Sequence, residues 1–241
     1  VAGLLQKGLW LDSASPVVAE LVGHVGFDWA LIDWEHGPND ITTLRAQVQA
    51  LGNTDTPCVV RVPDAQDWMI KQVLDIGVQT VVVPMVNTAD QALCMARACR
   101  YPPGGTRGMG AALARATDYG LRSDYVATTN DQICCIVQAE TVQAFSNLAD
   151  IAATDGIDGV FIGPADLSAD MGHPGNPAHP DVIKAIEDAC QTITQAGKYA
   201  GIVDFTPEAC RHWRDCGFTF LGLGADVSTL MRGLQALRDS L

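Results

Sequence analysis

The chain has 241 residues, of which 48% are hydrophobic and 18% are charged, and its 15 basic and 28 acidic side chains give a formal charge of −13. This composition excludes a disordered protein, and the acidic balance argues against nucleic acid or an anionic membrane surface as a partner. No apolar run approaches the roughly 18 residues of a membrane span, and the N-terminus lacks the pattern of a signal peptide. We therefore expect a soluble, cytoplasmic protein.

Eight cysteines raise the question of disulfides or a zinc site. None forms a C-x-x-C pair, and most lie inside apolar runs such as Ile133-Cys134-Cys135-Ile136. A cysteine in such a run behaves as a small hydrophobic residue. The sequence thus predicts reduced thiols in a hydrophobic core, which suits the cytoplasm.

Short β-branched runs alternate with amphipathic segments along the whole chain, which predicts parallel βα units. The expected strands are 8–11, 29–33, 58–62, 80–84, 133–138, 159–162, 199–203 and 219–223, with helices between them, for example over 40–51 and 65–74. Eight such units predict a single closed (β/α)8 TIM barrel over residues 1–241, with an open doubly wound sheet as the alternative. One long connection, 101–131, is of the kind that forms lids or binding loops.

In such a barrel the active site lies at the carboxyl ends of the strands, and several strands end in residues that do chemistry. These are Asp33, Trp34, Glu35 and His36 at the second strand, Arg61 at the third, Gln138 and Glu140 at the fifth, Gly163 to Asp166 at the sixth, Asp204 at the seventh and Asp226 at the eighth. Glu140 and Asp166 would lie on adjacent strands, where a pair of oxygen ligands suits Mg²⁺ or Mn²⁺ better than zinc. The alternative is that each carboxylate only caps the helix that follows it.

The other residues at these strand ends each have two interpretations. Arg61 would stabilise the negative charge of an enolate beside a metal, or would form an ion pair with a neighbouring carboxylate. His36 is a candidate general base, or an ordinary loop histidine. The backbone N–H groups from Gly163 to Ala165 would receive a carboxylate, or would form an ordinary βα turn. None of the four lysines is expected at a carboxyl end, so the sequence predicts no Schiff-base chemistry.

A series of motifs resembles, in order, the pattern of the HpcH/HpaI family of class II pyruvate aldolases, typified by the 4-hydroxy-2-oxoheptanedioate aldolases. The motifs are GLW at 8–10, GFDW at 26–29, IDWEH at 32–36, VRVP at 60–63, LDIG at 74–77, VPMV at 83–86, YPPG at 101–104 with RG at 107–108, QAET at 138–141 and IGPADLS at 162–168. They extend over nearly the whole chain, so the resemblance independently implies a (β/α)8 barrel.

The resemblance also implies an activity, the reversible cleavage of a 4-hydroxy-2-oxo acid into an aldehyde and pyruvate or a related 2-oxo acid. A divalent cation, Mg²⁺ or Mn²⁺ with Co²⁺ or Zn²⁺ as alternatives, would be bound by Glu140 and Asp166 and would stabilise the enolate. The resemblance further implies that Arg61 contacts the keto oxygen, that the backbone of Gly163 and Ala165 binds the carboxylate and that Gln138 contacts water or substrate. It also implies that Asp33 supports the water shell of the metal. His36 and Asp75 would form an acid–base dyad. From the sequence alone, Asp75 looks like a helix-end residue.

Members of this family assemble as trimers or hexamers and often exchange their last helix between subunits, so the resemblance implies a homo-oligomer. The helix expected over 228–241 carries the apolar residues Leu230, Met231, Leu234 and Leu237, which would pack on a neighbouring subunit or equally well on their own barrel. The partners expected for this chain are therefore its own copies and small molecules, namely a 2-oxo acid and an aldehyde.

Trp34 departs from the family pattern, which usually has glycine or another small residue at this position. We expect its indole to narrow the aldehyde pocket or to stack on the acceptor. Two other functions stay open. One is a lyase of the same superfamily that acts on CoA thioesters. The sequence argues against this function, because it has no basic cluster that would bind the CoA phosphates. The other is a non-catalytic barrel that binds a metal and an oxo acid.

Overall fold

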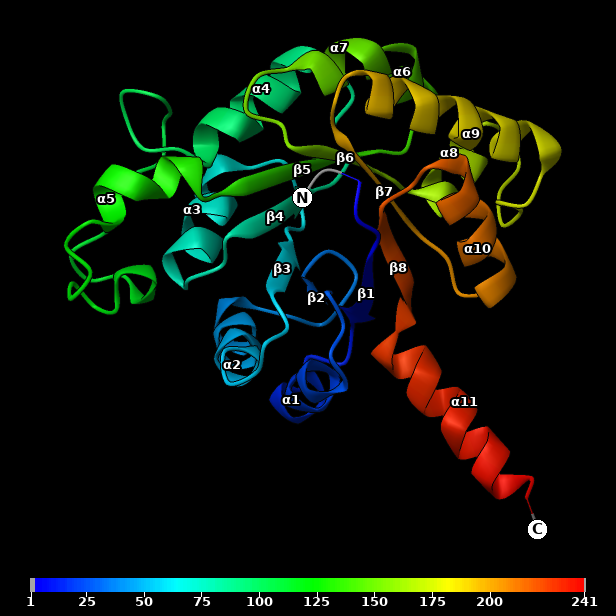
Figure 1. The fold of residues 1–241 in the computed structure, drawn as a ribbon, viewed down its shortest axis with the longest axis horizontal. Coiled ribbons are helices and arrows are strands. Elements are labelled where there is room, and N and C mark those ends of the chain that lie inside the picture. Colours follow the sequence, from blue (N-terminus) through cyan, green and yellow to red (C-terminus); the bar gives the residue numbers. More distant parts are fainter. Residues whose placement is uncertain (1–2, 241) are drawn as a thin grey trace.

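The computed structural model describes residues 3–240, in which eight parallel strands close into a barrel in sequence order (Figure 1). The strands are β1 (Gln6–Leu11), β2 (Trp29–Asp33), β3 (Cys58–Arg61), β4 (Thr80–Val83), β5 (Cys134–Ala139), β6 (Gly159–Ile162), β7 (Tyr199–Val203) and β8 (Phe220–Ala225). The predicted (β/α)8 barrel is confirmed, and the open sheet is excluded because β8 pairs with β1. Every predicted strand boundary lies within two residues of the observed one.

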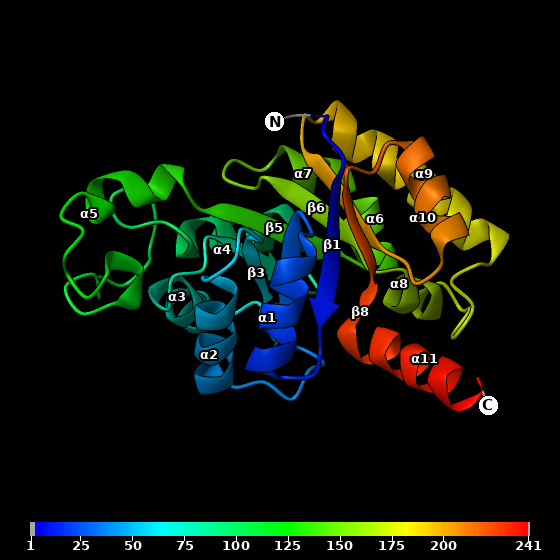
Figure 2. The same ribbon diagram turned by 60° about the horizontal axis from the view of Figure 1, so that its bottom comes forward.

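Helices follow the strands and cover the outside of the barrel (Figure 2). They are α1 (Pro16–Val25), α2 (Ile41–Leu51), α3 (Asp67–Asp75), α4 (Ala89–Ala98), α5 (Tyr125–Thr128), α6 (Val142–Ser146), α7 (Leu148–Ala153), α8 (Pro164–Asp170), α9 (Pro180–Gln195), α10 (Pro207–Cys216) and α11 (Asp226–Arg238), with short 3-10 turns η1 (Arg115–Thr117) and η2 (Thr129–Asp131). Several helices begin after a residue whose side chain caps the first turn. For example, Asp40 and Thr43 form a capping box at the start of α2, as the polar residues there predicted.

Aromatic side chains fill the interior of the barrel. They are Trp10, Trp29, Phe161 and Phe220, of which Trp29 and Phe220 stack with ring centroids 4.2 Å apart. Glycines make room for these rings, since a Cβ on Gly8 would lie 2.0 Å from the Trp29 ring and a Cβ on Gly222 would lie 2.7 Å from the Trp10 ring. The interior is therefore a packed core, which leaves the carboxyl end of the barrel as the place for a site.

Helix α11 leaves the barrel instead of packing on it (Figures 1 and 2). Its apolar side chains are more than half exposed, at 59% for Leu230, 57% for Met231, 53% for Leu234 and 70% for Leu237. Packing of this helix on its own barrel, one of the two interpretations of its sequence, is thus excluded. Helix α1 has a matching stripe of exposed apolar residues, Val17, Leu21 and Val25, spaced at one per turn.

The long connection after α4 is organised around a buried arginine. Arg107 donates to Asp75 Oδ1 over 2.7 Å, and its guanidinium lies 4.4 Å from the centroid of the Tyr101 ring. Farther along, the connection exposes the large apolar residues Met109, Leu113 and Leu121. It is therefore an ordered loop with an apolar outer surface, which is a property of surfaces that bind another protein.

The eight cysteines are all free thiols. Cys99, Cys135 and Cys190 are buried and four others are half-buried, whereas Cys94 is exposed on α4, where the prediction of a core position is wrong. Within the described part of the chain, no helix is both long and apolar enough to cross a membrane.

Candidate active site

A cavity of about 260 Å³ opens at the carboxyl end of the barrel. Eight of the ten predicted site residues line it, namely Asp33, His36, Arg61, Gln138, Glu140, Gly163, Ala165 and Asp166. They come from four different strand ends, so closure of the barrel is what brings them together. Trp34 and Asp75 do not line the cavity.

Arg61, at the end of β3, is the centre of the polar network in this cavity. Its Nε and Nη2 donate to the two carboxylate oxygens of Asp33 over 2.8 and 2.6 Å, and its Nη1 lies 2.8 Å from Glu35 Oε2. Burial alone would lower the pKa of Arg61, but the hydrogen bonds and charge of Asp33 and the charge of Glu35 raise it. The ion-pair interpretation of Arg61 is therefore confirmed, and the paired guanidinium also faces the cavity.

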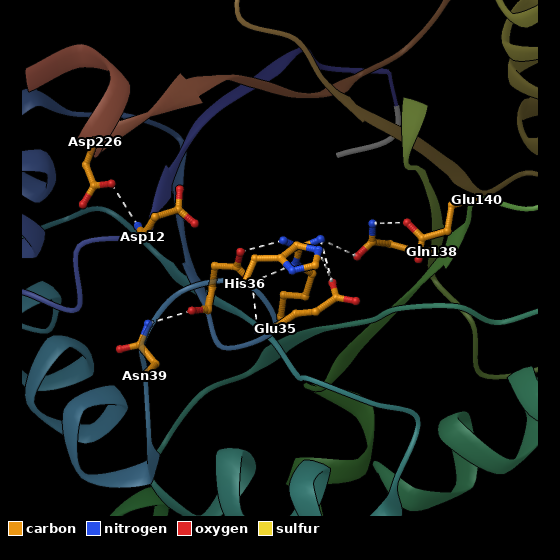
Figure 3. A network of polar contacts seen from close by, with 9 residues as sticks. Asp12, Glu35, His36, Asn39, Gln138, Glu140 and Asp226 are labelled. Carbon is orange, nitrogen blue, oxygen red and sulfur yellow. Dashed lines mark hydrogen bonds and ion pairs between the residues drawn. The ribbon is translucent and has the colours of Figure 1, made fainter. Parts of the chain in front are cut away.

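Glu140, directly after β5, is a buried carboxylate with a fixed orientation. Its Oε1 accepts a hydrogen bond from the backbone N–H of Met85 over 2.8 Å, and its Oε2 accepts one from Gln138 Nε2 over 2.9 Å (Figure 3). Met85 has a left-handed φ of 56°, which costs a non-glycine residue energy and is found mostly at functional sites. A Cβ on Gly163 would lie 2.2 Å from Glu140 Oε2, so this glycine leaves the space that the carboxylate fills.

The electrostatics of Glu140 fit a bound cation. Burial, opposed in part by the hydrogen bond from Met85 and reinforced by the charges of Glu35 and Asp166, raises the pKa of Glu140 to about 7. Glu140 and Asp166 thus interact at one cavity, and a divalent cation there would compensate the negative charge. The donors are oxygen atoms, which suits Mg²⁺ or Mn²⁺.

Sequence reasoning missed one acidic residue of the cavity, Asp12, which follows β1 directly. Burial, followed by the charge of Asp33, raises the pKa of Asp12 to about 7. Asp226 fixes the turn that carries Asp12, because Asp226 Oδ1 accepts a hydrogen bond from the Asp12 N–H over 2.9 Å (Figure 3). In addition, Asp226 Oδ2 accepts one from Ser13 Oγ over 2.5 Å. The rule that found the other site residues also applies to Asp12, which stands at the carboxyl end of the first strand.

The remaining predicted residues lie differently from what we expected. Trp34 packs against the hydrophobic layer between strands and helices, so the expectation that it narrows the pocket is not met within one subunit. The His36 side chain is 68% exposed, and its Nε2 lies 3.9 Å from Glu35 Oε2. Asp75 ends α3, and because α3 runs back antiparallel to the strands, that end lies at the opposite rim of the barrel from His36. One subunit alone therefore forms no His36–Asp75 dyad.

The lysines lie away from the cavity. Lys7 lies inside β1 and not before it as expected, but it is the second residue of that strand and far from its carboxyl end. Among residues 3–240, no lysine lines the cavity. The positive charge available to a substrate in this cavity thus comes from Arg61.

A second cavity of about 640 Å³ adjoins the first and shares Pro164, Ala165, Val203 and Phe205 with it. The loop that carries Phe205 is fixed by Asp204, whose carboxylate accepts from the Phe205 N–H over 2.7 Å and from Trp213 Nε1 over 3.3 Å. Phe205 thus lines both cavities, and the exposed lining of the larger one is mainly apolar.

Comparison with known proteins identifies the family of the chain. The family model of the HpcH/HpaI aldolase/citrate lyase family matches residues 6–233. A hydroxypyruvate/pyruvate aldolase of Pseudomonas aeruginosa is 49% identical over 98% of this chain and 88% of its own length, and a 4-hydroxy-2-oxo-heptane-1,7-dioate aldolase of Klebsiella pneumoniae is 50% identical over 98% and 89%. The crystal structure of a family member from Burkholderia cenocepacia superposes with a TM-score of 0.95 at 38% identity, covering 98% of this chain and 95% of that one.

A closed (β/α)8 barrel with an arginine and several carboxylates at its carboxyl end defines an enzyme scaffold of the aldolase and citrate lyase type. The chain belongs to the HpcH/HpaI aldolase/citrate lyase family, as the order of its motifs implied.

Proposed function

We propose that this protein is a metal-dependent pyruvate aldolase that reversibly cleaves a 4-hydroxy-2-oxo acid into pyruvate and an aldehyde. The observation that carries the proposal is the placement of Arg61, fixed by Asp33 and Glu35, in the same small cavity as Glu140 and Asp166. Relatives at about half identity are named as aldolases that act on such compounds. Glu140 and Asp166 would bind the cation.

The chain's own groups account for substrate binding. Arg61 Nη1 is 3.4 Å from Gln138 Oε1, a long hydrogen bond that a keto oxygen would replace with a stronger one. Gly163 and Ala165 line the cavity, and their backbone would receive the substrate carboxylate. A divalent cation, when bound, polarises the keto group and stabilises the charge that develops there.

The reaction then requires a base and an acid. Cleavage starts when a base removes the proton of the 4-hydroxyl, after which the C3–C4 bond breaks, the aldehyde forms and the electron pair moves into the pyruvate enolate beside Arg61. Protonation at C3 gives pyruvate. His36, at the mouth of the cavity, is the base in this proposal, with Nε2 as the accepting atom.

The proposed dyad of His36 and Asp75 requires two copies of the chain. Asp75 is 27% exposed, and it lies beside the long loop that exposes Met109, Leu113 and Leu121. We propose that this apolar loop contacts a second copy and that Asp75 orients its His36 there.

Helix α11 supports a homo-oligomer by its own geometry. The stripe of Leu230, Leu234 and Leu237 has no cover in its own barrel, and Val17, Leu21 and Val25 on α1 offer an exposed stripe of the same kind. We propose that α11 of one copy packs on α1 of another, which is reciprocal in a two-fold pair. Leu234→Asp would then lower the mass measured by light scattering, and an unchanged mass would contradict this packing.

The two rival functions have less support. The cavity of about 260 Å³ suits a molecule the size of a small oxo acid, and its single basic side chain, Arg61, is paired with Asp33, which leaves little to bind CoA phosphates. A non-catalytic binding protein would not need Arg61 at a position where it polarises a keto group. The eight free thiols suit a reducing compartment, and we propose a cytoplasmic location.

A coupled assay tests the proposal. The chelator-treated protein is given Mg²⁺ or Mn²⁺ and a panel of 4-hydroxy-2-oxo acids, and pyruvate release is followed. We expect turnover that requires the metal and is lost in Glu140→Gln but kept in Asp150→Asn, a change at an exposed position of α7. Absence of pyruvate from every compound, with an acyl-CoA cleaved instead, would assign the protein to the CoA lyases.

A further inference from the structure

Three metal-ligating side chains of different types meet on the outer surface of the barrel, away from the cavity. Glu187 comes from α9, and His212 and Cys216 come from one face of α10, four residues apart. Figures 1 and 2 show these two helices side by side. His212 Nε2 lies 3.1 Å from Glu187 Oε1 and 3.7 Å from Cys216 Sγ. All three donor atoms lie within 4.8 Å of one another.

The two distances from His212 Nε2 are close to the edges of a tetrahedron around zinc. Metal–ligand distances of about 2.05 Å for nitrogen or oxygen and about 2.3 Å for sulfur place tetrahedral donors about 3.4 Å (N and O) and about 3.6 Å (N and S) apart. The observed distances of 3.1 and 3.7 Å differ from these values by a few tenths of an ångström. A cation therefore fits with small side-chain adjustments, and water would occupy the fourth position.

We propose that Glu187, His212 and Cys216 form a second metal site, specific for a borderline-soft divalent cation such as Zn²⁺. An imidazole and a thiolate select such a cation over Mg²⁺ or Mn²⁺, in contrast to the oxygen ligands of the active site. The site is open to solvent, since the side chains of His212 and Glu187 are 45% and 35% exposed.

The surrounding charge favours a cation at this place. Burial and the carboxylates of Glu187 and Asp215 raise the pKa of the Cys216 thiol, because they disfavour its negative form. A bound cation reverses this balance and makes the thiolate the stable form. The neighbouring Arg214 is paired with Asp215 over 2.7 Å, so its charge is already compensated.

A second cluster of possible metal ligands contains His173, His179 and Asp181 and is a poorer candidate for a metal site. His173 and His179 stack with ring centroids 3.5 Å apart, and Asp181 Oδ2 lies 4.0 and 3.7 Å from their nitrogens. His179 Nδ1, however, already accepts the N–H of Asp181 over 3.3 Å at the start of α9. This cluster is used as a helix cap and has no soft thiolate donor.

Occupation of the α9–α10 site would join the carboxyl half of α10 to α9. His212 and Trp213 also line the larger of the two cavities, so the cation would fix one of its walls. The site is independent of the proposed catalytic metal, because its residues belong to different elements and its donors to a different class.

Cobalt substitution tests the site by its sulfur ligand. The reduced, metal-free protein is titrated with Co²⁺ in excess Mg²⁺, and the near-ultraviolet sulfur-to-cobalt charge-transfer band is recorded. Zn²⁺ is then added to displace the bound Co²⁺. We expect one equivalent of Co²⁺ per chain to produce the band, and Zn²⁺ to abolish it. Cys216→Ser should lose the band, and His212→Gln should need a higher Co²⁺ concentration to develop it.

Two controls separate this site from others. Cys210→Ser removes a half-buried thiol on the same helix, and Glu140→Gln removes a proposed ligand of the active site, and both should keep the band. The proposal is overturned if no band develops in the wild-type protein, or if the band survives in Cys216→Ser. Circular dichroism of each variant distinguishes loss of the ligand from loss of the fold.

Discussion

Glu140→Gln should make the metal-free protein more stable at alkaline pH while it abolishes metal binding. Burial and neighbouring charges raise the pKa of Glu140 to about 7 from an ordinary value of 4.5, so ionised Glu140 costs the folded state about 3 kcal/mol above pH 7. Glutamine removes this cost. It also places an amide NH₂ opposite Gln138 Nε2, which now donates to Glu140 Oε2 over 2.9 Å, and losing that hydrogen bond costs about 1 kcal/mol. Glu140→Gln should therefore raise the free energy of unfolding by about 2 kcal/mol.

The sign of the effect depends on pH. Because the folded-state pKa is the higher one, the folded wild-type protein binds an extra proton between the unfolded value of 4.5 and the folded value of about 7. The stability of the wild-type protein relative to Glu140→Gln therefore falls as the pH rises through this window. The gain of about 2 kcal/mol expected at pH 8 should disappear near pH 5, where the remaining cost of ionised Glu140 is about equal to the cost of the lost hydrogen bond.

Thermal unfolding in chelator, at equal protein concentration for both proteins, measures this difference. A gain of about 2 kcal/mol corresponds to a rise in Tm of about 4–8 °C for a chain of this size. Added Mn²⁺ should then raise the Tm of the wild-type protein and not that of Glu140→Gln. A Tm of Glu140→Gln at or below the wild-type value at pH 8 in chelator would refute the reasoning about this buried carboxylate.

Four further changes test other parts of the site. Arg61→Ala should lower kcat/KM by about 10²–10³-fold with metal affinity largely kept, and near-normal turnover would exclude its role at the keto oxygen. Gly163→Ala introduces a Cβ 2.2 Å from Glu140 Oε2, so calorimetry should show weaker Mn²⁺ binding, and an unchanged affinity would contradict the packing seen here. Asp75→Asn should lower kcat in the wild-type background but have little further effect on His36→Ala, whereas additive losses would argue against a dyad. Phe205→Ala should join the two cavities and raise kcat/KM for bulky aldehydes relative to small ones, which an aldehyde panel would show or disprove.

The barrel could be predicted because its strands are buried on both faces and so appear as continuous apolar runs, of which Thr80–Val83 is an example. The position of the site followed from one topological rule, since parallel strands present their carboxyl ends at one rim. That rule found Arg61, Glu140 and Asp166, and applied to the first strand it would also have found Asp12.

The orientation of Trp34 was also readable from the sequence, although we expected the opposite. Side chains alternate along a strand, so Asp33 facing the cavity implies that the next residue faces outward and that Glu35 faces inward again. The structure has this arrangement, with Asp33 and Glu35 both on Arg61 and with Trp34 in the outer layer.

Other features have no local signal. Asp75 ends α3, far from His36 in one subunit, and the dyad proposed for the two residues needs a second copy of the chain. The apolar stripe on α11 has the same sequence pattern as that of any amphipathic helix. The pattern does not indicate whether the helix packs on its own barrel or on that of another copy. The cluster of Glu187, His212 and Cys216 joins two helices, so a search for close cysteine pairs does not find it.

The central claim is that this cavity generates a pyruvate enolate with the help of a divalent cation. The most direct test is exchange of the methyl protons of pyruvate in heavy water without any aldehyde, followed by NMR, because exchange requires enolisation and not just binding. We expect exchange with Mg²⁺ or Mn²⁺ that stops in chelator and in Glu140→Gln. Metal-loaded wild-type protein that binds pyruvate without incorporating deuterium would contradict it.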